Sequence, residues 1–466
     1  MQIQFSKPMA RVVAVAAATA AGLLGFAPAM AAPADSIIPV PCSVVALVAA
    51  INTAPSGSVL VLASECTYTL DEPLPTINDT LIFEGSLTTT IARSTEEETP
   101  NFSIMTVGDG GSVTTDEVNF TNGDSSEDGV NGGAIYNDGG QVYLNYGTFS
   151  DNHAQDYGGA IYNTDGLLKA NGVLFVGNTA AHGGAIENNS VAFITGCHFS
   201  HNFANMTGGA VRNQAQTTIA TSTFVANHAA NGGGLYNAAG TTTVGTSDFE
   251  DNLAGEGGGI ENEALLHLAS DNFDSNGNNI KPSVVVSGVV RNAPDAPLAP
   301  VVLTTVGGGV YNDSTMTLVH STFTGNEAVQ GGGLYNEGTA TMSSDTFTDN
   351  SATHFGGGID NEDTSTLTAS DLHGNNAGMD GGGIYNEFQE TITSTKIHGN
   401  HAVRDGGGMY NEEFLTISGS QVEQNSAGTT GGGIYNEDSV TLSSTAVVSN
   451  TPNNCAPPGS VIGCIG

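Results

Sequence analysis

Two asparagine positions recur along most of the chain and set the strongest constraint on its fold. The first ends the pattern Gly-Gly-x-aliphatic-x-Asn and lies at positions 137, 163, 188, 213, 237, 262, 312, 336, 361, 386, 411 and 436. The second follows at a nearly constant distance, at positions 152, 178, 202, 227, 252, 276, 326, 350, 375, 400, 425 and 450. Successive repeats are almost equal in length, apart from the double interval between positions 262 and 312. Such a period, held by two independent landmarks, predicts a solenoid of stacked coils.

Each repeat also carries three apolar positions in register. Two of them precede the second asparagine and one precedes the first, as Leu318, Phe323 and Val310 do in one repeat. Local alternation around these positions is typical of short strands, which would stack about 4.8 Å apart. We therefore expect an all-β fold. It is a single-stranded right-handed parallel β-helix over positions 70–450, with three strands in each coil of roughly 25 residues and about 14–15 coils.

The segment 1–31 has the layout of a secretory signal peptide. Lys7 and Arg11 precede or open an apolar, alanine-rich run, and Ala29-Met30-Ala31 offers small residues for cleavage after Ala31. No other stretch approaches the roughly 18 apolar residues of a membrane-spanning helix. The sequence therefore predicts a secreted, extracellular protein with no membrane span in the mature chain.

Four of the five cysteines bracket the two ends of the repeat array. We predict one disulfide at each end, in an N-terminal cap at 32–69 and a C-terminal disulfide cap at 451–466, because an uncovered end coil would expose an unpaired strand edge. The N-terminal cap includes a short apolar helix, expected at 43–52. The bonded residues would be Cys42 with Cys66 and Cys455 with Cys464. The remaining Cys197 is expected to be a small buried side chain.

Residues 277–306 account for the single long interval between repeats. This segment contains four prolines and two of the nine basic residues, Lys281 and Arg291. We expect a protruding loop or hairpin. Two interpretations remain open: an insertion that is tolerated because loop closure costs little, or a protrusion that binds a partner.

The repeat resembles one that is known in bacteria. Phe149-Ser-Asp-Asn152 and Gly158-Gly-Ala-Ile161 are similar to the paired tetrads of the chlamydial polymorphic outer membrane proteins. The pattern over roughly residues 40–450 also resembles the wider set of secreted, pectin-lyase-like β-helix proteins. The resemblance implies a right-handed parallel β-helix and, for the membrane-protein branch, a role in adhesion.

The charge balance excludes several partners. The chain has 9 Lys and Arg against 47 Asp and Glu, which gives a formal net charge of −38. Nucleic acids and anionic membranes both require a basic surface, so neither is expected to bind. An acidic polysaccharide would be repelled unless a cation stood between the two.

The residue just before the first asparagine is often tyrosine. Alternation from the buried aliphatic position places it on the outside, where a flat row of exposed phenols would bind a glycan or a cell-surface partner. Cross-strand packing that stiffens the sheet is an equally good interpretation. The candidate binding residues are Tyr311, Tyr335, Tyr385, Tyr410 and Tyr435.

The residue just after the first asparagine is acidic in seven successive repeats, from Glu263 to Glu437. Carboxylates stacked about 4.8 Å apart repel one another, and rows of anionic oxygens suit Ca²⁺. Calcium bridging is one hypothesis, and a solvated turn that uses glutamate for solubility is the other. The candidate calcium ligands are Glu337, Glu362, Glu387, Glu412 and Glu437.

The tyrosine row is interrupted by Glu187, Arg212, Glu261 and Asp360. Glu187 and Arg212 are one coil apart and are expected to pair. The three carboxylates would lie three and four coils apart, beyond about 14 Å, whereas a glycosidase needs roughly 5–9.5 Å. No catalytic residue is assigned on this row.

Two other clusters were weighed for chemistry. Arg404 stands beside Asp405, which is expected to neutralise it. His373 and His398 occupy equivalent positions in adjacent coils, but the sequence suggests no third metal ligand, which favours a surface pair. The predicted function is therefore non-catalytic adhesion or binding of a glycan or surface. The alternative is a polysaccharide-modifying enzyme, either a pectate-lyase-like lyase or a glycoside hydrolase.

Overall fold

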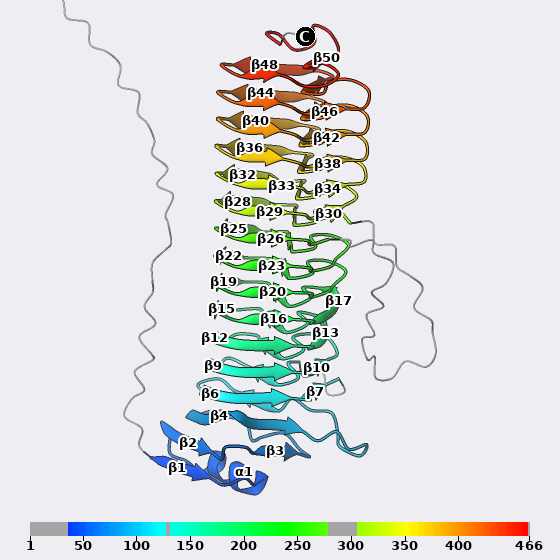
Figure 1. Ribbon diagram of the computed structural model, residues 1–466. Coiled ribbons are helices and arrows are strands. Elements are labelled where there is room, and N and C mark those ends of the chain that lie inside the picture. The colour runs from blue at the N-terminus through cyan, green and yellow to red at the C-terminus, as the bar shows by residue number, and fades with distance from the viewer. Residues whose placement is uncertain (1–35, 127–130, 278–304, 465–466) are drawn as a thin grey trace, which may run out of the picture.

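The computed structural model describes residues 36–126, 131–277 and 305–464. This part of the chain is an all-β parallel solenoid of about 16 turns, a little more than the 14–15 expected (Figure 1). The additional turns come from the N-terminal region, where strands before residue 121 stack beneath the first regular repeat. The predicted signal peptide and most of the 277–306 insertion lie outside the described residues.

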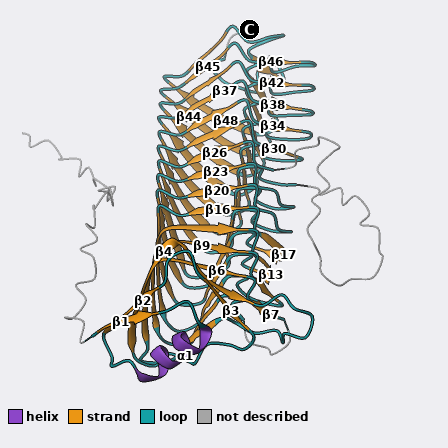
Figure 2. Cartoon of the chain, turned by 60° about the horizontal axis from the view of Figure 1, so that its bottom comes forward, coloured by secondary structure: helices purple, strands orange, loops and turns teal. Residues whose placement is uncertain are grey.

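The strands form four stacks that run along the solenoid (Figures 1 and 2). The first stack contains β1 (Ile37–Val40), β2 (Ser58–Leu62), β4 (Thr80–Arg93), β6 (Ser112–Thr121), β9 (Gln141–Ser150), β12 (Leu167–Val176), β15 (Val191–Thr195), β19 (Gln216–Ala220), β22 (Thr241–Gly245), β25 (Leu265–Ala269), β28 (Thr315–Val319), β32 (Thr339–Ser343), β36 (Thr364–Thr368), β40 (Gln389–Thr393), β44 (Phe414–Ser418) and β48 (Ser439–Ser443).

The second stack follows the first after a short bend, or continues the same long strand in β4 to β12. It also contains β3 (Thr67–Leu70), β16 (His198–Ser200), β20 (Thr223–Val225), β23 (Asp248–Glu250), β26 (Asn272–Asp274), β29 (Thr322–Thr324), β33 (Thr346–Thr348), β37 (Asp371–His373), β41 (Lys396–His398), β45 (Gln421–Glu423) and β49 (Ala446–Val448).

The third stack holds the strands that end in the first asparagine. It contains β5 (Met105–Val107), β8 (Ile135–Asn137), β11 (Ile161–Asn163), β14 (Ile186–Asn188), β18 (Val211–Asn213), β21 (Leu235–Asn237), β24 (Ile260–Asn262), β27 (Val310–Asn312), β31 (Leu334–Asn336), β35 (Ile359–Asn361), β39 (Ile384–Asn386), β43 (Met409–Asn411), β47 (Ile434–Asn436) and β50 (Cys455–Ala456).

A fourth, shorter stack was not predicted. It contains β7 (Asp124–Ser125), β10 (His153–Ala154), β13 (Thr179–His182) and β17 (Phe203–Thr207), and later β30 (Glu327–Ala328), β34 (Ser351–Ala352), β38 (Asn376–Ala377), β42 (His401–Ala402) and β46 (Ser426–Ala427). Three strands per coil is therefore wrong for the coils that contain one of these. The physical reason is an alanine shortly after the second asparagine, such as Ala377, which is fully buried and fits where two coils approach closely.

The three predicted apolar rows form the core. Leu318, Phe323 and Val310 are fully buried, as are their equivalents in the neighbouring coils. Along the phenylalanine row the rings stack face to face, for example Phe273 on Phe323 with centroids 4.6 Å apart. Each such side chain contributes roughly 1.5–3 kcal/mol by burial, and stacking identical side chains fills the interior without gaps.

Both asparagine rows are buried ladders of hydrogen bonds. The Asn178 amide donates to Oδ1 of Asn202 at 2.9 Å and to the Phe149 carbonyl at 2.9 Å. In the other row, the Asn137 amide donates to Oδ1 of Asn163 at 2.6 Å. Along both rows an amide donates to the asparagine of the neighbouring coil, and a residue without an amide at these positions would leave the neighbour's buried polar atoms unpaired.

The glycine pair closes the corner before the strands of the third stack from β8 to β47. Gly356 has a φ of 61°, in the left-handed region that glycine adopts without strain. A Cβ atom on the next residue, Gly357, would lie 2.4 Å from the carbonyl oxygen of Gly382 in the following coil. The first glycine is therefore required by backbone conformation and the second by the close approach of adjacent coils.

Both predicted disulfides are present, Cys42–Cys66 and Cys455–Cys464, and Cys197 is free and buried as expected. The predicted N-terminal helix is α1 (Val44–Thr53), which lies at the first end of the solenoid and contacts β1 and β3 (Figure 2). Its role as a cap stays a prediction. It is the one helix of the described residues, and it is too short to cross a membrane.

The long interval between repeats adds no turn to the third stack. Strand β24 pairs directly with β27, and Asn262 donates to Asn312 at 2.8 Å although the two are far apart in the sequence. The asparagine ladder therefore continues unbroken past the position of the insertion.

Candidate functional site

The five candidate tyrosines are the central residues of strands in the third stack. Tyr311 pairs with Tyr335, and Tyr385 pairs with Tyr410 and then Tyr435 along the axis. Their rings stack with centroid separations of 5.5 Å for the first pair and of 5.1 and 4.8 Å for the two steps of the second group. Between the two groups, Asp360 occupies the same row. The row predicted from the sequence is thus a real structural feature.

The row is not a surface of exposed phenols, which corrects the expectation. Tyr335, Tyr385 and Tyr410 are only 5, 8 and 8 % exposed, while Tyr311 and Tyr435 are half-buried. Each ring is covered by the ring above or below it, and Phe355 also stacks on Tyr385 at 4.7 Å. Alternation correctly places these side chains outside the core, but rings stacked at the strand spacing cover one another. Most of the surface of these tyrosine rings is therefore buried in contacts between adjacent strands.

The tyrosine and glutamate rows are joined by hydrogen bonds. The Tyr311 hydroxyl donates to Oε2 of Glu337 at 2.6 Å, and the Tyr410 hydroxyl donates to Oε1 of Glu437 at 2.5 Å. Tyr385 makes the equivalent contact with Glu412. Burial, followed by the neighbouring carboxylate, raises the pKa of each of these three tyrosines, so the phenols remain donors. The two candidate rows are one structural unit that links each coil to the next.

The glutamate ladder retains solvent access. Glu337, Glu387 and Glu437 are exposed, and Glu362 and Glu412 are half-buried. Burial raises the pKa of Glu387, with further contributions from the negative charges of Glu362 and Glu412. In the described residues, no three of these carboxylates lie close enough together to surround one ion. Calcium binding at Glu337, Glu362, Glu387, Glu412 and Glu437 therefore stays a prediction that requires the side chains to move.

The interruptions of the tyrosine row hold buried carboxyl groups. Glu187 pairs with Arg212 at 2.8 Å, as predicted, yet its burial outweighs the guanidinium and raises its pKa to about 7. Burial raises the pKa of Glu261 to about 9 and that of Asp360 well above its ordinary value. In the described residues no lysine or arginine pairs with Asp360. Burial therefore shifts each of these carboxyl groups toward its neutral form, and Arg212 opposes that shift for Glu187.

The carboxylates of this row do not form a glycosidase pair. Three strand pairings separate Glu261 from Asp360, one coil fewer than expected because the insertion adds no turn. Three steps of about 4.8 Å still place them about 14 Å apart, beyond the spacing of either glycosidase mechanism. Arg404 also differs from its expectation, since it pairs with Asp380 of the preceding coil and not with Asp405.

Two exposed aromatic residues beside the glutamate ladder were missed. Phe388 and Phe414 lie on adjacent coils and are 40 and 51 % exposed, with an edge-to-face contact at 6.4 Å. Phe388 directly follows Glu387, and Phe414 follows the acidic pair that begins at Glu412. The signal in the sequence was an aromatic residue in a turn where the other late coils have small or polar residues. We call Glu387, Phe388, Glu412, Phe414 and Glu437 the acidic turn face.

A third ligand was also missed beside the two predicted neighbours His373 and His398. Asp371 lies on the same strand as His373, and its Oδ1 is 3.0 Å from Nε2 of His398. Equivalent positions in adjacent coils do not reveal this ligand, because it lies two residues from His373 on the same face of the strand. In the described residues these three form the single group of three potential metal ligands within reach of one ion.

Comparison with known proteins supports the repeat and the fold. Residues 147–164 match the model of the Chlamydia polymorphic membrane protein repeat. No curated protein sequence matches the chain.

Solved structures with a similar course of the chain are all distant in sequence. Tailspike protein 3 of bacteriophage CBA120 shows a TM-score of 0.36 and 10% identity, over 88% of this chain and 60% of the tailspike chain. The chain thus spans less than two thirds of the tailspike. PfbA, a surface adhesin of Streptococcus pneumoniae, shows a TM-score of 0.25 and 10% sequence identity, over 86% of each chain. A family 28 exopolygalacturonase of Yersinia enterocolitica shows a TM-score of 0.26 and 9% sequence identity, over 89% of this chain and 79% of the exopolygalacturonase chain.

The repeat match lies on the Phe149 and Gly158 tetrads, and the strand pairing is parallel throughout the named strands. The chain is a parallel β-helix, and residues 147–164 are similar to the repeat of the Chlamydia polymorphic membrane proteins.

Proposed function

We propose that this protein is a secreted, non-catalytic, right-handed β-helix that binds a glycan or another extracellular surface partner through the acidic turn face. The tyrosines first suggested as the binding row, Tyr385 and Tyr410 among them, then form the layer that holds this face in place. Two structural disulfides support a protein of an oxidising compartment.

The observation that carries the proposal is the exposure of Phe388 and Phe414 between carboxylates. Exposed large aromatic side chains are costly in water, and two in contact on adjacent coils form an apolar patch with a polar rim. Sugars combine apolar C–H faces with hydroxyl donors. The C–H face of a sugar packs against an aromatic ring, and the Glu387 and Glu412 carboxylates accept hydrogen bonds from the sugar hydroxyls.

The scaffold suits recognition of an extended partner. Every turn of the face follows a buried asparagine, such as Asn386, that is hydrogen-bonded to the next coil. A surface that is already ordered loses little conformational entropy on binding. The net charge of −38 favours a neutral or cationic partner over an acidic one.

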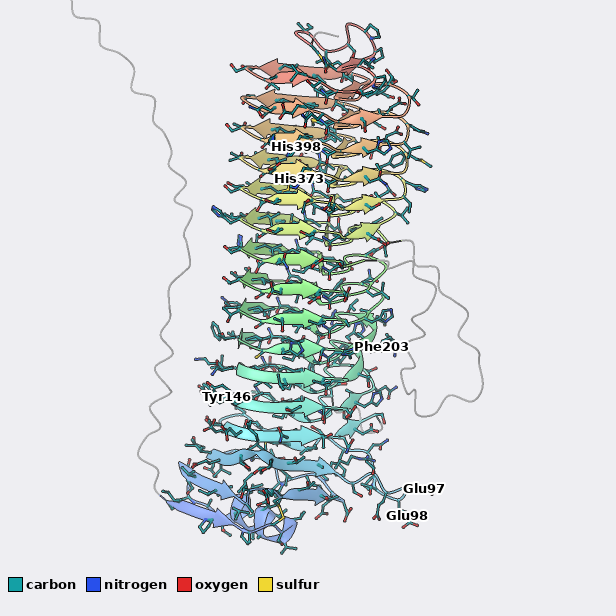
Figure 3. The ribbon with its side chains drawn as sticks, in the orientation of Figure 1. Glu97, Glu98, Tyr146, Phe203, His373 and His398 are labelled. Carbon is teal, nitrogen blue, oxygen red and sulfur yellow. A yellow bond between two sulfur atoms is a disulfide. The ribbon has the colours of Figure 1, made fainter. Side chains whose placement is uncertain are left out.

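Binding is tested with the mature chain on a glycan array and on intact cells. The variant Phe388→Ser with Phe414→Ser should lose at least about tenfold in affinity, since both rings are exposed and their removal does not disturb the core. The matched control is Tyr146→Ser, which removes a ring that is 53 % exposed on an early coil (Figure 3). Equal binding by the double variant and the wild type would contradict the proposal.

The enzyme alternative has its own test. Glycans that bind are incubated with the protein and assayed for new reducing ends and for the absorbance of unsaturated uronides, with and without calcium. We expect neither signal, because the buried carboxyls of the third stack are too far apart to cooperate. Turnover of any bound glycan would replace binding by catalysis as the function.

The calcium hypothesis is tested separately by thermal melting with Ca²⁺ and with a chelator. Binding across the glutamate ladder should raise the midpoint of the wild type and leave a Glu387→Gln, Glu412→Gln, Glu437→Gln variant unchanged. An identical midpoint in both conditions would reject the ladder as a calcium site.

A further inference from the structure

Three side chains that can bind a metal ion lie together on the outward face of the second stack, outside the hydrophobic core. Strand β37 carries Asp371 and His373, and β41 carries His398 directly opposite His373. Leu372 and Ile397 point inward and are fully buried, so the flanking residues point outward. The two imidazole rings stack at 5.1 Å, one coil apart (Figure 3).

The three ligand atoms already have the spacing of a metal site. Oδ1 of Asp371 lies 3.0 Å from Nε2 of His398 and 3.6 Å from Nδ1 of His373, and all three lie within 4.8 Å of one another. Ligands about 2.0–2.1 Å from a tetrahedral Zn²⁺ are separated by roughly 3.4 Å. The two distances to Asp371 bracket this value, and the third pair of ligand atoms, within 4.8 Å of each other, would adjust by rotation of the imidazole side chains.

A hydrogen bond fixes the orientation of one imidazole. The Thr348 hydroxyl and Nε2 of His373 are 3.0 Å apart, which directs Nδ1 toward Asp371. That Nδ1 is buried and has no hydrogen-bond partner. A buried ring nitrogen without a partner costs free energy, and a bound cation would satisfy it.

We propose that Asp371, His373 and His398 bind one divalent transition-metal ion of the Zn²⁺ type. Two imidazoles and one carboxylate suit zinc and its neighbours and are a poor set for Ca²⁺, which takes six or more oxygen ligands. Three protein ligands leave a coordination position for solvent or an external group. The site lies on a different stack from the acidic turn face and does not depend on the proposed function.

The surroundings are compatible with a cation. The neighbouring Lys396 ammonium is drawn toward Glu423 of the following coil, at 3.6 Å. Asp371 also lines an open cavity of about 410 Å³ together with Thr346, Lys396 and Gln421. An external ligand of the metal would therefore have room beside the carboxylate.

The test is a calorimetric titration of the untagged mature chain with ZnCl₂. The wild type should bind one ion at this site, and the separate variants His373→Ala, His398→Ala and Asp371→Asn should each lose at least tenfold in affinity. Thr348→Val should weaken binding about 10–100-fold, as changes to a ligand's supporting hydrogen bond do. The matched control is His401→Ala, an exposed histidine on β42 that bonds Ser426.

Two further measurements keep the result interpretable. Circular dichroism shows whether each variant folds. If an alanine variant does not fold, Asp371→Asn still tests the site, because it preserves the volume of the side chain. Co²⁺ should give the visible absorption of a tetrahedral site in the wild type and in His401→Ala only. Absence of Zn²⁺ binding to the wild type, or binding unchanged in both His373→Ala and His398→Ala, would overturn the proposal.

Discussion

The described coils before residue 278 and those after residue 304 share an interior and differ outside. Inside, both asparagine ladders pass from one set to the other without a break, with Asn276 donating to Asn326 at 3.1 Å. The phenylalanine stack also continues across the boundary, from Phe273 to Phe323. The interior therefore follows the same rules over the whole regular array.

Outside, the residue after the first asparagine changes from mixed to acidic. In the first five regular coils it is Asp138, Thr164, Asn189, Gln214 and Ala238, and from Glu263 in the last early coil onward it is always Asp or Glu. The central outward row of the first stack changes as well. Lys169 lies between the rings of Tyr143 and Phe193 in the early coils, whereas the equivalent late residues are threonines in register from Thr317 to Thr441.

The buried carboxyls of the tyrosine row differ in their partners. Glu187 pairs with Arg212, whereas Glu261 in the early coils and Asp360 in the late coils have no lysine or arginine partner among the described residues. Stacking fixes the inward residues because each must match its neighbour at about 4.8 Å. The outward residues are free to vary, and the proposed acidic turn face consists of residues that differ between the two sets of coils.

The largest expected effect is a fall in stability as pH rises, with contributions from both sets of coils. Burial raises the pKa of Glu187, Asp271 and Asp345 to about 7, of Glu390 to about 8 and of Glu261 to about 9. The folded chain therefore holds more protons than the unfolded chain above about pH 4. Stability is lost progressively from there up to the raised values, by about 1.4 kcal/mol per pKa unit for each group.

Denaturant unfolding at pH 5 and pH 8 measures this effect. High salt serves as the control, because it screens repulsion among surface charges but not the burial of these carboxyls. We expect the protein at pH 5 to be more stable than the protein at pH 8 even in high salt. Equal stability at the two pH values would show that these groups do not hold protons in the fold.

The next effect contrasts the two buried carboxyls directly. Arg212→Ala leaves Glu187 buried without its cation and should cost about 3–5 kcal/mol. Asp360→Asn replaces a carboxyl that has no cationic partner among the described residues and should leave stability at pH 8 unchanged or higher. Both are measured by chemical denaturation. An equal loss of stability in the two variants would show that the cationic partner of Glu187 makes no difference.

The smallest effect tests the shared interior. Asn202→Ala and Asn375→Ala each remove one member of the same buried ladder and leave a neighbouring amide unpaired. Each should cost about 1–3 kcal/mol, and the two costs should agree. A clear difference between them in urea unfolding would mean that the ladder does not stabilise early and late coils alike.

Much of the fold was predictable because a regular period converts position in the chain into position in space. The apolar rows, both asparagine rows and the Glu187–Arg212 pair follow from residues that occupy equivalent places. The Cys42–Cys66 and Cys455–Cys464 disulfides follow from cysteines that bracket the two ends of the array. The fourth stack was missed because its signal is a single alanine in each coil, which carries no strand preference.

The candidate site was less predictable, because it depends on contacts between different rows. Equivalence placed Tyr385 outside the core but could not show that Phe355 and Tyr410 cover its ring. It aligned His373 with His398 but not the diagonal contact from Asp371. Phe388 was not predicted as a site residue, because it lies beside the glutamate ladder and interrupts none of the repeated rows. Contacts between side chains of different rows depend on their conformations, which the repeat pattern does not specify.

The central claim is that the late coils carry the binding surface, and hydroxyl-radical footprinting tests it most directly. Oxidation of Phe388 and Phe414 is compared with that of Tyr146 in the same sample, with and without a glycan or cell-surface fragment that binds. All three rings are at least 40 % exposed in the free protein. The account predicts that the partner protects Phe388 and Phe414 and leaves Tyr146 unchanged. Protection of Tyr146 alone, or of none of the three while the partner is bound, would contradict it.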